Sequence, residues 1–217
     1  MVVAYLRDQA EVYDWLFDFI AQRRDLGTSF IKELHQLLTR NQESTEALDQ
    51  FGNTLTVPLQ RGSWKSQVNN PKRPDESVHE YCPPEQVAAE MDQLLAWHRS
   101  HCLARVAPEV EAAWLHHRFT QIHPFQDGNG RVARALASLV LIREGRFAFS
   151  VAPDDKGTYI DALERADAGS LSQLISFVTE GQQREFGQAL SVARALVDEQ
   201  QVLQRRLRKL QRRKPIV

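Results

Sequence analysis

The stretch HPFQDGNGRVAR, residues 123–134, brings a base, an acid, a glycine-rich turn and two arginines into twelve consecutive positions. Gly128 and Gly130 permit backbone conformations that other residues avoid, and a turn that opens a helix points unpaired N–H groups outward at the positive end of the helix dipole. Such a helix start binds anions. Arg131 and Arg134 are three positions apart, so both can project from the first turn of that helix toward phosphate oxygens.

The residues that could carry a proton or hold a metal ion lie before this turn. His123 ends the helix predicted ahead of it, and an unperturbed pKa near ~6.5 lets an imidazole accept a proton around neutral pH. Asp127 directly precedes the glycines, where a carboxylate beside bound phosphates commonly holds Mg²⁺. The sequence therefore predicts a phosphoryl-transfer centre at which base, metal ligand and anion site converge.

Other nucleotide-binding and metal-binding patterns fit less well. A P-loop needs GxxxxGK followed by Ser or Thr, and a dinucleotide fold needs GxGxxG in a βαβ unit, and the sequence contains neither. His116 and His123 are seven positions apart on one helix face, which raises a metal-hydrolase site as an alternative. Because His116 and His117 stand among apolar residues, we interpret them as packed or hydrogen-bonded histidines.

The amino-acid composition is typical of a globular protein and disfavours several other classes. The chain has 217 residues, of which 42% are hydrophobic and 25% charged, and this balance suits one globular domain. A formal net charge of −1 argues against binding to nucleic acid or an anionic membrane. Cys82 and Cys102 lack a CxxC spacing, which suits a reducing compartment and disfavours a zinc site. No apolar run reaches the length of a membrane span or signal peptide, so we expect a cytoplasmic protein.

Apolar residues recur at helical spacing through most of the chain, which predicts a mostly helical fold. The predicted helices cover residues 12–20, 30–38, 87–95, 112–122, 131–145, 158–168, 171–180 and 183–214. Between Asn41 and Pro84 the helical pattern disappears, and Leu55–Val57 with Trp64–Val68 predict the two short strands of a small hairpin. We therefore divide the chain into an N-terminal helix (1–25), a core domain (26–182) and a long C-terminal helix (183–217).

The C-terminal helix differs from the others in its pattern. Its apolar residues recur at roughly heptad intervals, at Val192, Leu196, Leu203, Leu207 and Leu210. A basic cluster follows them within residues 205–214. We interpret this cluster as a solvated helix face or a link to a further domain, and a homo-oligomer is left open.

Residues 123–134 resemble the complete signature of the Fic family, HxFx(D/E)GNGRxxR, and fill every position of it. The similarity extends to FIKELHQLL at 30–38, YCPP at 81–84 and the helix at 112–122, so that it covers roughly residues 26–177. The resemblance implies an all-α Fic fold, in which a helical bundle surrounds a central motif-bearing helix pair and carries a small β-hairpin flap. It also implies protein AMPylation, with ATP as donor and Mg²⁺ as metal. The related Doc kinases lack the GNGR pattern, so transfer of phosphate is the less favoured variant.

The resemblance gives each motif residue a role. His123 would deprotonate a Ser, Thr or Tyr hydroxyl of a target protein, and Asp127 would bind Mg²⁺. The nucleotide-binding set would be Phe125, Gly128, Asn129, Gly130, Arg131 and Arg134. Within it, Asn129 and Gly130 would form an anion hole, Arg131 would hold phosphate and Arg134 would engage the γ-phosphate.

In family members the flap binds the target protein by strand addition. Residues 62–78 occupy the matching place here, and the resemblance assigns target binding to Gly62, Ser63, Trp64, Lys65 and Ser66. Trp64 and the NNPKRP stretch stand out, although an ordinary exposed loop with one packing aromatic is an equal alternative.

Many Fic proteins are restrained by a helix with the pattern (S/T)xxxE(G/N), whose Glu pairs with the second motif arginine, here Arg134. Ser176 and Glu180 fit this short pattern. They stand in a segment whose apolar residues are typical of a core helix, so we favour a structural role for them.

Several activities fit the same phosphate site. Removal of AMP from a modified target, transfer of UMP, and transfer of phosphocholine all remain open, as does a catalytically silent binding module. A silent module is expected to lose the base, the metal ligand or the anion-hole residues. Because none of these is missing, the intact motif favours an enzyme.

Overall fold

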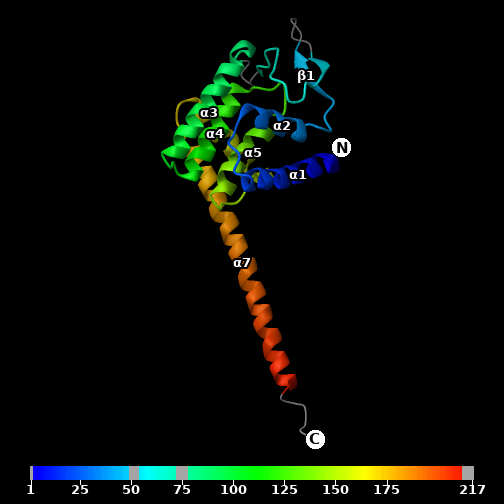
Figure 1. Ribbon diagram of the computed structural model, residues 1–217, viewed down its shortest axis with the longest axis vertical. Coiled ribbons are helices and arrows are strands. Elements are labelled where there is room, and N and C mark those ends of the chain that lie inside the picture. The colour runs from blue at the N-terminus through cyan, green and yellow to red at the C-terminus, as the bar shows by residue number, and fades with distance from the viewer. Residues whose placement is uncertain (1, 49–53, 72–77, 212–217) are drawn as a thin grey trace.

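Helices α4 (Pro108–Ile122) and α5 (Asn129–Arg143) form the centre of the fold. Helix α4 starts with Pro108, at a position where the missing N–H would have no helical partner. Helix α5 buries residues around nearly its whole circumference, as expected for a helix in the middle of a bundle. The computed structural model describes residues 2–48, 54–71 and 78–211, and it places the other helices around this pair (Figure 1).

Five further helices surround the central pair. Helices α1 (Val2–Ala21) and α2 (Thr28–Leu38) pack on each other and on α5, while α3 (Val87–Leu103) packs on α4. Helices α6 (Lys156–Asp167) and α7 (Ser172–Gln211) pack on each other and on α4. Two short 3-10 turns, η1 (Pro84–Gln86) and η2 (Pro153–Asp155), lead into α3 and α6. The predicted all-α class is confirmed.

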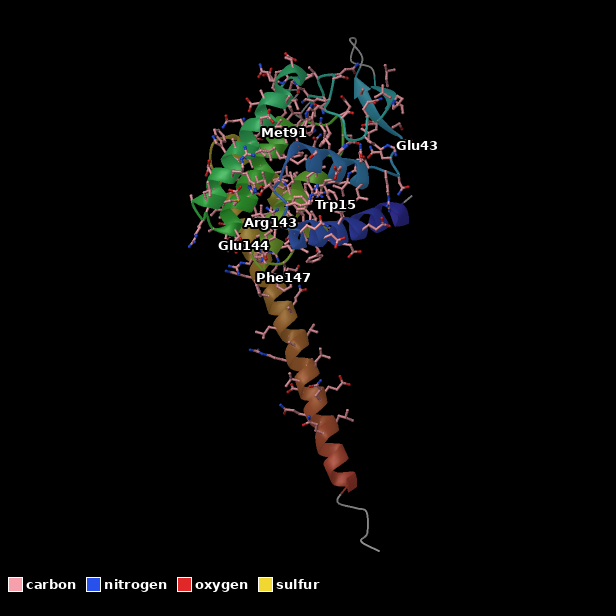
Figure 2. The ribbon with its side chains drawn as sticks, in the orientation of Figure 1. Trp15, Glu43, Met91, Arg143, Glu144 and Phe147 are labelled. Carbon is pink, nitrogen blue, oxygen red and sulfur yellow. The ribbon has the colours of Figure 1, made fainter. Side chains whose placement is uncertain are left out.

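The apolar faces of these helices meet in one core. The ring of Trp15 on α1 stacks on Phe30 of α2 with centroids 4.4 Å apart, and the ring of Phe19 packs against Phe30 at a tilt of 38°. Figure 2 shows the side chains crowded within the helical body, whereas those along the distal part of α7 stand clear of it. None of the helices in the described part of the chain is long and apolar enough to cross a membrane.

A two-stranded antiparallel hairpin follows α2. Strand β1 (Ser44–Leu48) pairs with β2 (Thr54–Pro58), with Ser44 opposite Pro58 and Leu48 opposite Thr54. The predicted hairpin and its strand at Leu55–Val57 are therefore confirmed, but the predicted second strand at Trp64–Val68 is wrong. That segment is irregular, because Trp64 packs against Phe125 and the Lys65 N–H donates to the carbonyl of Pro124 at 2.8 Å. Packing against the motif loop replaces a strand ladder there.

The C-terminal part of the chain forms a single helix where the sequence predicted two. Helix α7 runs without interruption from Ser172 to Gln211, through Gly181 and Gly187. A glycine inside a helix costs about 1 kcal/mol relative to alanine, which is too little to break a helix of this length. Only the first turns of α7 are anchored by buried apolar side chains, and the remainder extends away from the domain (Figure 1). The boundary predicted at 182/183 therefore falls inside a helix, and residues 212–217 lie outside the described part.

Candidate active site

His123 is placed by the end of α4. It caps this helix in the left-handed conformation (φ 50°, ψ 57°), and its N–H donates to the carbonyl of Phe119 at 3.0 Å. The imidazole lies flat on the ring of Tyr81, with the two ring centroids 3.8 Å apart and the planes at 15°. The chain reverses at His123, so the imidazole is held beside the turn that starts α5.

The environment of His123 favours a neutral imidazole. Burial, followed by the positive charge of Lys65, lowers the pKa of His123 from 6.5 to about 4. Its Nδ1 atom is buried and has no hydrogen-bond partner among the described residues. At neutral pH the ring is therefore uncharged and can accept a proton.

The motif turn is fixed by its own side chains. The Asn129 amide accepts from the N–H of Phe125 at 2.9 Å and donates to the carbonyl of the same residue at 2.7 Å. Gly128 adopts φ 78°, and a Cβ atom there would lie 3.0 Å from the Thr39 methyl group, so both its conformation and its surroundings favour glycine.

This turn exposes the first amides of α5. The N–H groups of Arg131 and Val132 donate to the carbonyl of Gly128. The amides of Asn129 and Gly130 lie in the first turn, where no intrahelical acceptor is available. Within the described part of the chain they remain available to an anion.

His35 of α2 supports the turn from the other side. Its Nε2–H donates to the carbonyl of Asp127 at 3.0 Å, and its Nδ1 accepts the N–H of Gly62 at 2.8 Å. The ring stacks on Phe125 at a centroid distance of 3.8 Å, and burial lowers the pKa of His35 to about 4. The sequence did not predict this role, although His35 lies within the FIKELHQLL segment. A lone histidine on an apolar helix face gives no sign of a function, because such residues are usually part of the core.

The carboxylate of Asp127 is held ready for a cation. Burial alone would raise its pKa, but hydrogen bonds from the Gln42 amide and the Gly128 N–H, together with the charge of Arg131, outweigh this effect, and the pKa lies below its ordinary value. The Gln42 amide nitrogen lies 2.5 Å from Asp127 Oδ2, and the hydroxyl of Thr45 lies 3.3 Å from the same atom. The side chain is therefore an oriented, ionised oxygen ligand.

Arg131 is tied to α2 and to the same glutamine. Its guanidinium donates to the carbonyl of Leu38 at 3.0 Å and to Gln42 Oε1 at 2.5 Å. Gln42 thus links the cation and the carboxylate of the motif, which was not foreseen from the sequence because residue 42 lies more than 80 positions away from both.

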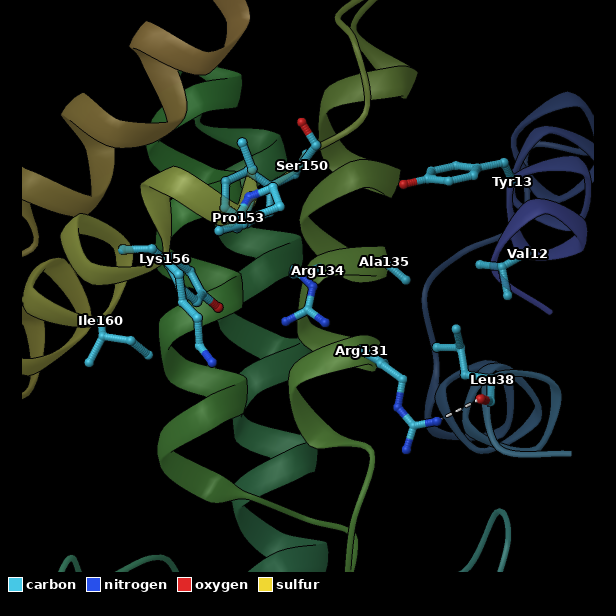
Figure 3. Close-up of a pocket in the computed structure, with 14 residues that line it drawn as sticks. Val12, Tyr13, Leu38, Arg131, Arg134, Ala135, Ser150, Pro153, Lys156 and Ile160 are labelled. Atoms are coloured by element: carbon cyan, nitrogen blue, oxygen red, sulfur yellow. Dashed lines mark hydrogen bonds between the residues drawn. The ribbon is translucent and has the colours of Figure 1, made fainter. Parts of the chain in front are cut away.

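Arg134 projects into a cavity of about 520 Å³ on one side of the motif (Figure 3). Arg131, Lys156 and Tyr159 line the cavity with it, and Val12 and Tyr13 of α1 close its far wall. The hydroxyl of Tyr159 lies 2.8 Å from Nε2 of His116, and the positive charge of Arg134 acts on it. Burial lowers the pKa of His116 to about 3 and raises that of Tyr159.

The histidines of α4 are therefore used in packing and hydrogen bonding. His116 pairs with Tyr159, and His117 Nε2 lies 2.9 Å from Asp167 Oδ1. Across the described ranges, no group of three or more His, Cys, Asp or Glu side chains is placed to hold a metal ion. The interpretation of His116 and His117 as hydrogen-bonded histidines therefore fits their contacts.

His123 and Asp127 face a second cavity, of about 700 Å³, on the other side of the turn. Its wall consists of Gln42, residues 44–47 of the hairpin, and the segment 68–71. The motif turn thus separates an arginine-lined cavity from a groove that holds the base and the acid.

The residues assigned to the flap divide into two groups. Gly62 and Lys65 are buried and Trp64 is half-buried against Phe125, while Ser63 and Ser66 are exposed. Lys65 Nζ donates to Asn69 Oδ1 at 2.9 Å, and the Asn69 amide donates to the carbonyls of Phe125 and Gln126. The buried members of this set support the motif from behind. Residues 72–77, which include part of the NNPKRP stretch, lie outside the described residues.

Ser176 and Glu180 lie on the exposed side of α7. The described residues that line the cavity around Arg134 come from α1, α2, α5 and the segment 149–160, and none comes from α7. The structural role favoured for the pair stays a prediction.

Comparisons with known proteins identify the family of this chain. Residues 25–141 match the family model of the Fic/DOC family. The protein adenylyltransferase Fic of Nematostella vectensis is 32% identical over 130 residues, which are 58% of this chain and 29% of that protein. A Fido domain-containing protein of Dictyostelium discoideum is 52% identical over 62 residues, covering 28% of this chain and 43% of that protein. The chain thus spans less than half the length of these relatives.

Solved structures give the same fold. A Fic domain-containing signaling protein from Bacteroides thetaiotaomicron superposes with a TM-score of 0.64 at 27% identity, over 81% of this chain and 67% of that one. Fic-1 of Caenorhabditis elegans superposes with a TM-score of 0.69 at 19% identity, over 87% of this chain and 51% of that one. Because the family match covers more than half of the sequence and includes the motif turn, the chain belongs to the Fic/DOC family.

Proposed function

We propose that the protein transfers AMP from ATP to a hydroxyl group of a target protein and releases pyrophosphate. The observation that carries this proposal is the placement of a neutral His123 and an ionised Asp127 on one side of the free amides of Asn129 and Gly130, with Arg134 on the other. The relative from Nematostella vectensis, a protein adenylyltransferase, supports the transfer of AMP.

His123 serves as the base that receives the proton of the attacking hydroxyl. Its lowered pKa keeps the acceptor nitrogen free at neutral pH, and the Tyr81 stack fixes the direction of the ring. An imidazole with a pKa of about 4 is a weak base at equilibrium. It acts because the reaction needs the proton removed only as the bond to phosphorus forms.

The phosphates bind along the start of α5. The N–H groups of Asn129 and Gly130 donate hydrogen bonds to the α-phosphate. They stabilise the negative charge that develops there, at the positive end of the helix dipole. Arg131 adds positive charge beside them, and Arg134 binds the γ-phosphate within the 520 Å³ cavity. Each of these groups is held by its neighbours before the nucleotide arrives, which lowers the cost of alignment.

Mg²⁺ fits the donor set around Asp127. The site offers one oriented carboxylate, and Mg²⁺ at nucleotide sites is commonly bound through one or two carboxylates together with substrate phosphates. Bound there, the ion would neutralise charge on the phosphates and orient the leaving group. The protein's own part is to hold the Asp127 carboxylate in place through Gln42 and Thr45.

The target hydroxyl enters through the 700 Å³ groove at His123. The β1 strand forms one wall of this groove, so the acceptor segment can bind in an extended conformation along the hairpin and the segment 68–71. We therefore propose target binding at Ser44–Ala47 and Val68–Pro71, and we assign Gly62, Trp64 and Lys65 to support of the motif.

The test uses ATP labelled either on the α-phosphate or on the γ-phosphate, supplied with Mg²⁺ and the full chain, and follows protein-bound label. Retention of the α label alone supports transfer of AMP, whereas retention of the γ label alone identifies a kinase. His123→Ala should bind ATP and transfer nothing. Parallel reactions with UTP and CDP-choline distinguish the alternative transferred groups. A release of AMP from modified proteins without any transfer would identify the reverse activity.

A further inference from the structure

The distal part of α7 exposes a row of large apolar side chains. The first of them, Phe186, still packs edge-on against Phe147, with ring centroids 4.8 Å apart. Seven of the fifteen large hydrophobic residues that are exposed lie between Phe186 and Leu203. Leu196 and Leu203 are each 57% exposed, so most of each side chain faces solvent. The seven are Phe186, Leu190, Val192, Leu196, Val197, Val202 and Leu203.

Several of these residues belong to a heptad seam. With Leu196 and Leu203 at position d, Leu210 follows at d one heptad later. Position a is then occupied by Ala193, Gln200 and Leu207. A helix with small or apolar residues at most a and d positions packs a second helix along this stripe.

The free part of α7 is long enough for a second helix to pack along it. From Phe186 to Gln211 the helix spans 26 residues, or about 39 Å, and it leaves the helical body as a rod (Figure 1). Most helical stability in proteins comes from packing an apolar face, so a partner along this stripe would stabilise the distal part of α7. The heptad seam would therefore stabilise α7 when a second helix packs along it.

We propose that the partner is the α7 of a second copy, in antiparallel orientation. Seven Lys and Arg residues lie within 205–214, and a parallel pair would bring these two basic ends together. In an antiparallel pair, a positions face d positions, so Leu196 of each copy lies opposite Leu207 of the other, and Ala193 opposite Leu210. Gln200 of each copy then meets Leu203 of the other at the centre.

The charges beside the seam favour this register. Glu199 and Arg206 both occupy position g. In an antiparallel pair g positions face g positions, and the register that aligns the leucines places Glu199 of each copy opposite Arg206 of the other. Two ion pairs, each between a glutamate and an arginine, thus flank the centre of the paired helices. Neither residue would meet the other in a parallel pair, where g positions face e positions.

This arrangement leaves both proposed active sites open. The two helical bodies would lie at opposite ends of the paired α7 helices, and no described residue from the distal part of α7 lines the cavities at Arg134 or His123. The inference is independent of the reaction that the domain catalyses.

Sedimentation velocity and light scattering over a concentration series test the pairing. The wild-type chain of 24.9 kDa should show twice this mass. Leu196→Glu combined with Leu203→Glu should give the monomer mass and leave the thermal unfolding of the helical body unchanged. Val202→Glu is the matched control, because Val202 is 47% exposed but stands at position c, outside the seam, and it should remain a dimer. A wild-type chain that is a monomer at every concentration overturns the proposal, and so does equal disruption by Val202→Glu.

A charge exchange tests the orientation. Glu199→Arg and Arg206→Glu should each raise the dissociation constant of the dimer about tenfold, since each places like charges together twice. The double variant should restore wild-type affinity, and an equimolar mixture of the two single variants should form mixed dimers. Failure of the double variant to recover would overturn the antiparallel register.

Discussion

The ring of Tyr81 lies flat on the imidazole of His123, with centroids 3.8 Å apart. Tyr81 comes from the segment before η1 and His123 from the end of α4, so the stack fixes the base from a second part of the chain. We predict that Tyr81→Leu lowers the rate of AMP transfer about tenfold with unchanged ATP affinity, because the imidazole loses its orientation. Tyr81→Phe keeps the stacking face and should retain most of the activity. Equal losses in both variants would assign the effect to the hydroxyl.

A second prediction concerns pH. Under the proposed function the neutral form of His123 accepts the proton, so the transfer rate should fall as pH decreases through about 4. Lys65→Met removes a positive charge that disfavours imidazolium, and the pKa of His123 should then rise toward 6.5. The acid limb of the rate profile should accordingly move to higher pH in the variant. An acid limb at the same pH in both proteins would show that Lys65 does not act on the base.

Acid also affects the folded state. His35, His116 and His123 all have pKa values lowered by burial, to about 4, about 3 and about 4. Between these values and 6.5 the unfolded chain binds more protons than the folded chain, so the free energy of unfolding should decrease as pH falls below about 6.5. Urea titrations at several pH values check this, and they define the range in which the rate profile reflects a folded enzyme. A free energy of unfolding that stayed constant from pH 7 to 4.5 would contradict it.

Two glycines allow a matched test of the turn. Gly128→Ala should destabilise the protein by about 1–2 kcal/mol, since φ is 78° and the new Cβ would lie 3.0 Å from Thr39. It should also reduce transfer, because the amides of Asn129 and Gly130 would shift. Gly157→Ala in α6 meets no atom within 4 Å and should leave activity unchanged while adding up to about 1 kcal/mol of stability. Similar effects from both substitutions would show that the turn has no special requirement.

Substitutions at Arg134 and Glu180 distinguish a role in nucleotide binding from a role in inhibition. Arg134→Ala should weaken ATP binding and lower transfer, because the γ-phosphate loses its cation. Tyr159→Phe should produce a smaller loss of the same kind, since Tyr159 and Arg134 line the same cavity. Glu180→Gly should leave transfer unchanged, because Glu180 is exposed on α7. A marked gain of self-modification in Glu180→Gly would instead identify an inhibitory glutamate.

Asp127→Asn tests the metal ligand. The amide keeps the size of the side chain but removes its charge, so we expect the Mg²⁺ concentration needed for half-maximal transfer to increase at least tenfold. Asp161→Asn, on the exposed side of α6, is the control and should change nothing. If both variants required the same Mg²⁺ concentration as the wild type, Asp127 would have a structural role only.

The sequence predicted the helices and the motif because both are local signals. Apolar spacing identifies α4 and α5, and the residues from His123 to Arg134 are contiguous, so their placement at one helix junction follows from chain connectivity. Single positions such as His35, Gln42 and Tyr81 gave no comparable signal. Their contacts join residues far apart in the sequence, and only the folded chain brings them to the motif.

The hairpin shows the limit of local reasoning more clearly. Leu55–Val57 forms a strand as its composition suggests, but its partner is Ser44–Leu48, which contains Glu and Ala and has no strong strand pattern. Trp64 was expected in a strand and packs instead beside Phe125. Segment 64–68 could either pair as a strand or bury the ring of Trp64. In the folded chain the ring is packed against Phe125, and no strand forms there.

The turn that divides the two cavities has a kinetic consequence for inhibitors. Arg134 lies on one side of it and His123 on the other, each with its own cavity. Under the proposed function, a small molecule that fills the arginine-lined cavity would compete with ATP while the target protein could still bind. A peptide that occupies the groove at β1 would show the opposite pattern. Under the proposed function, the donor and acceptor sites can therefore be blocked separately, by compounds of different chemical class.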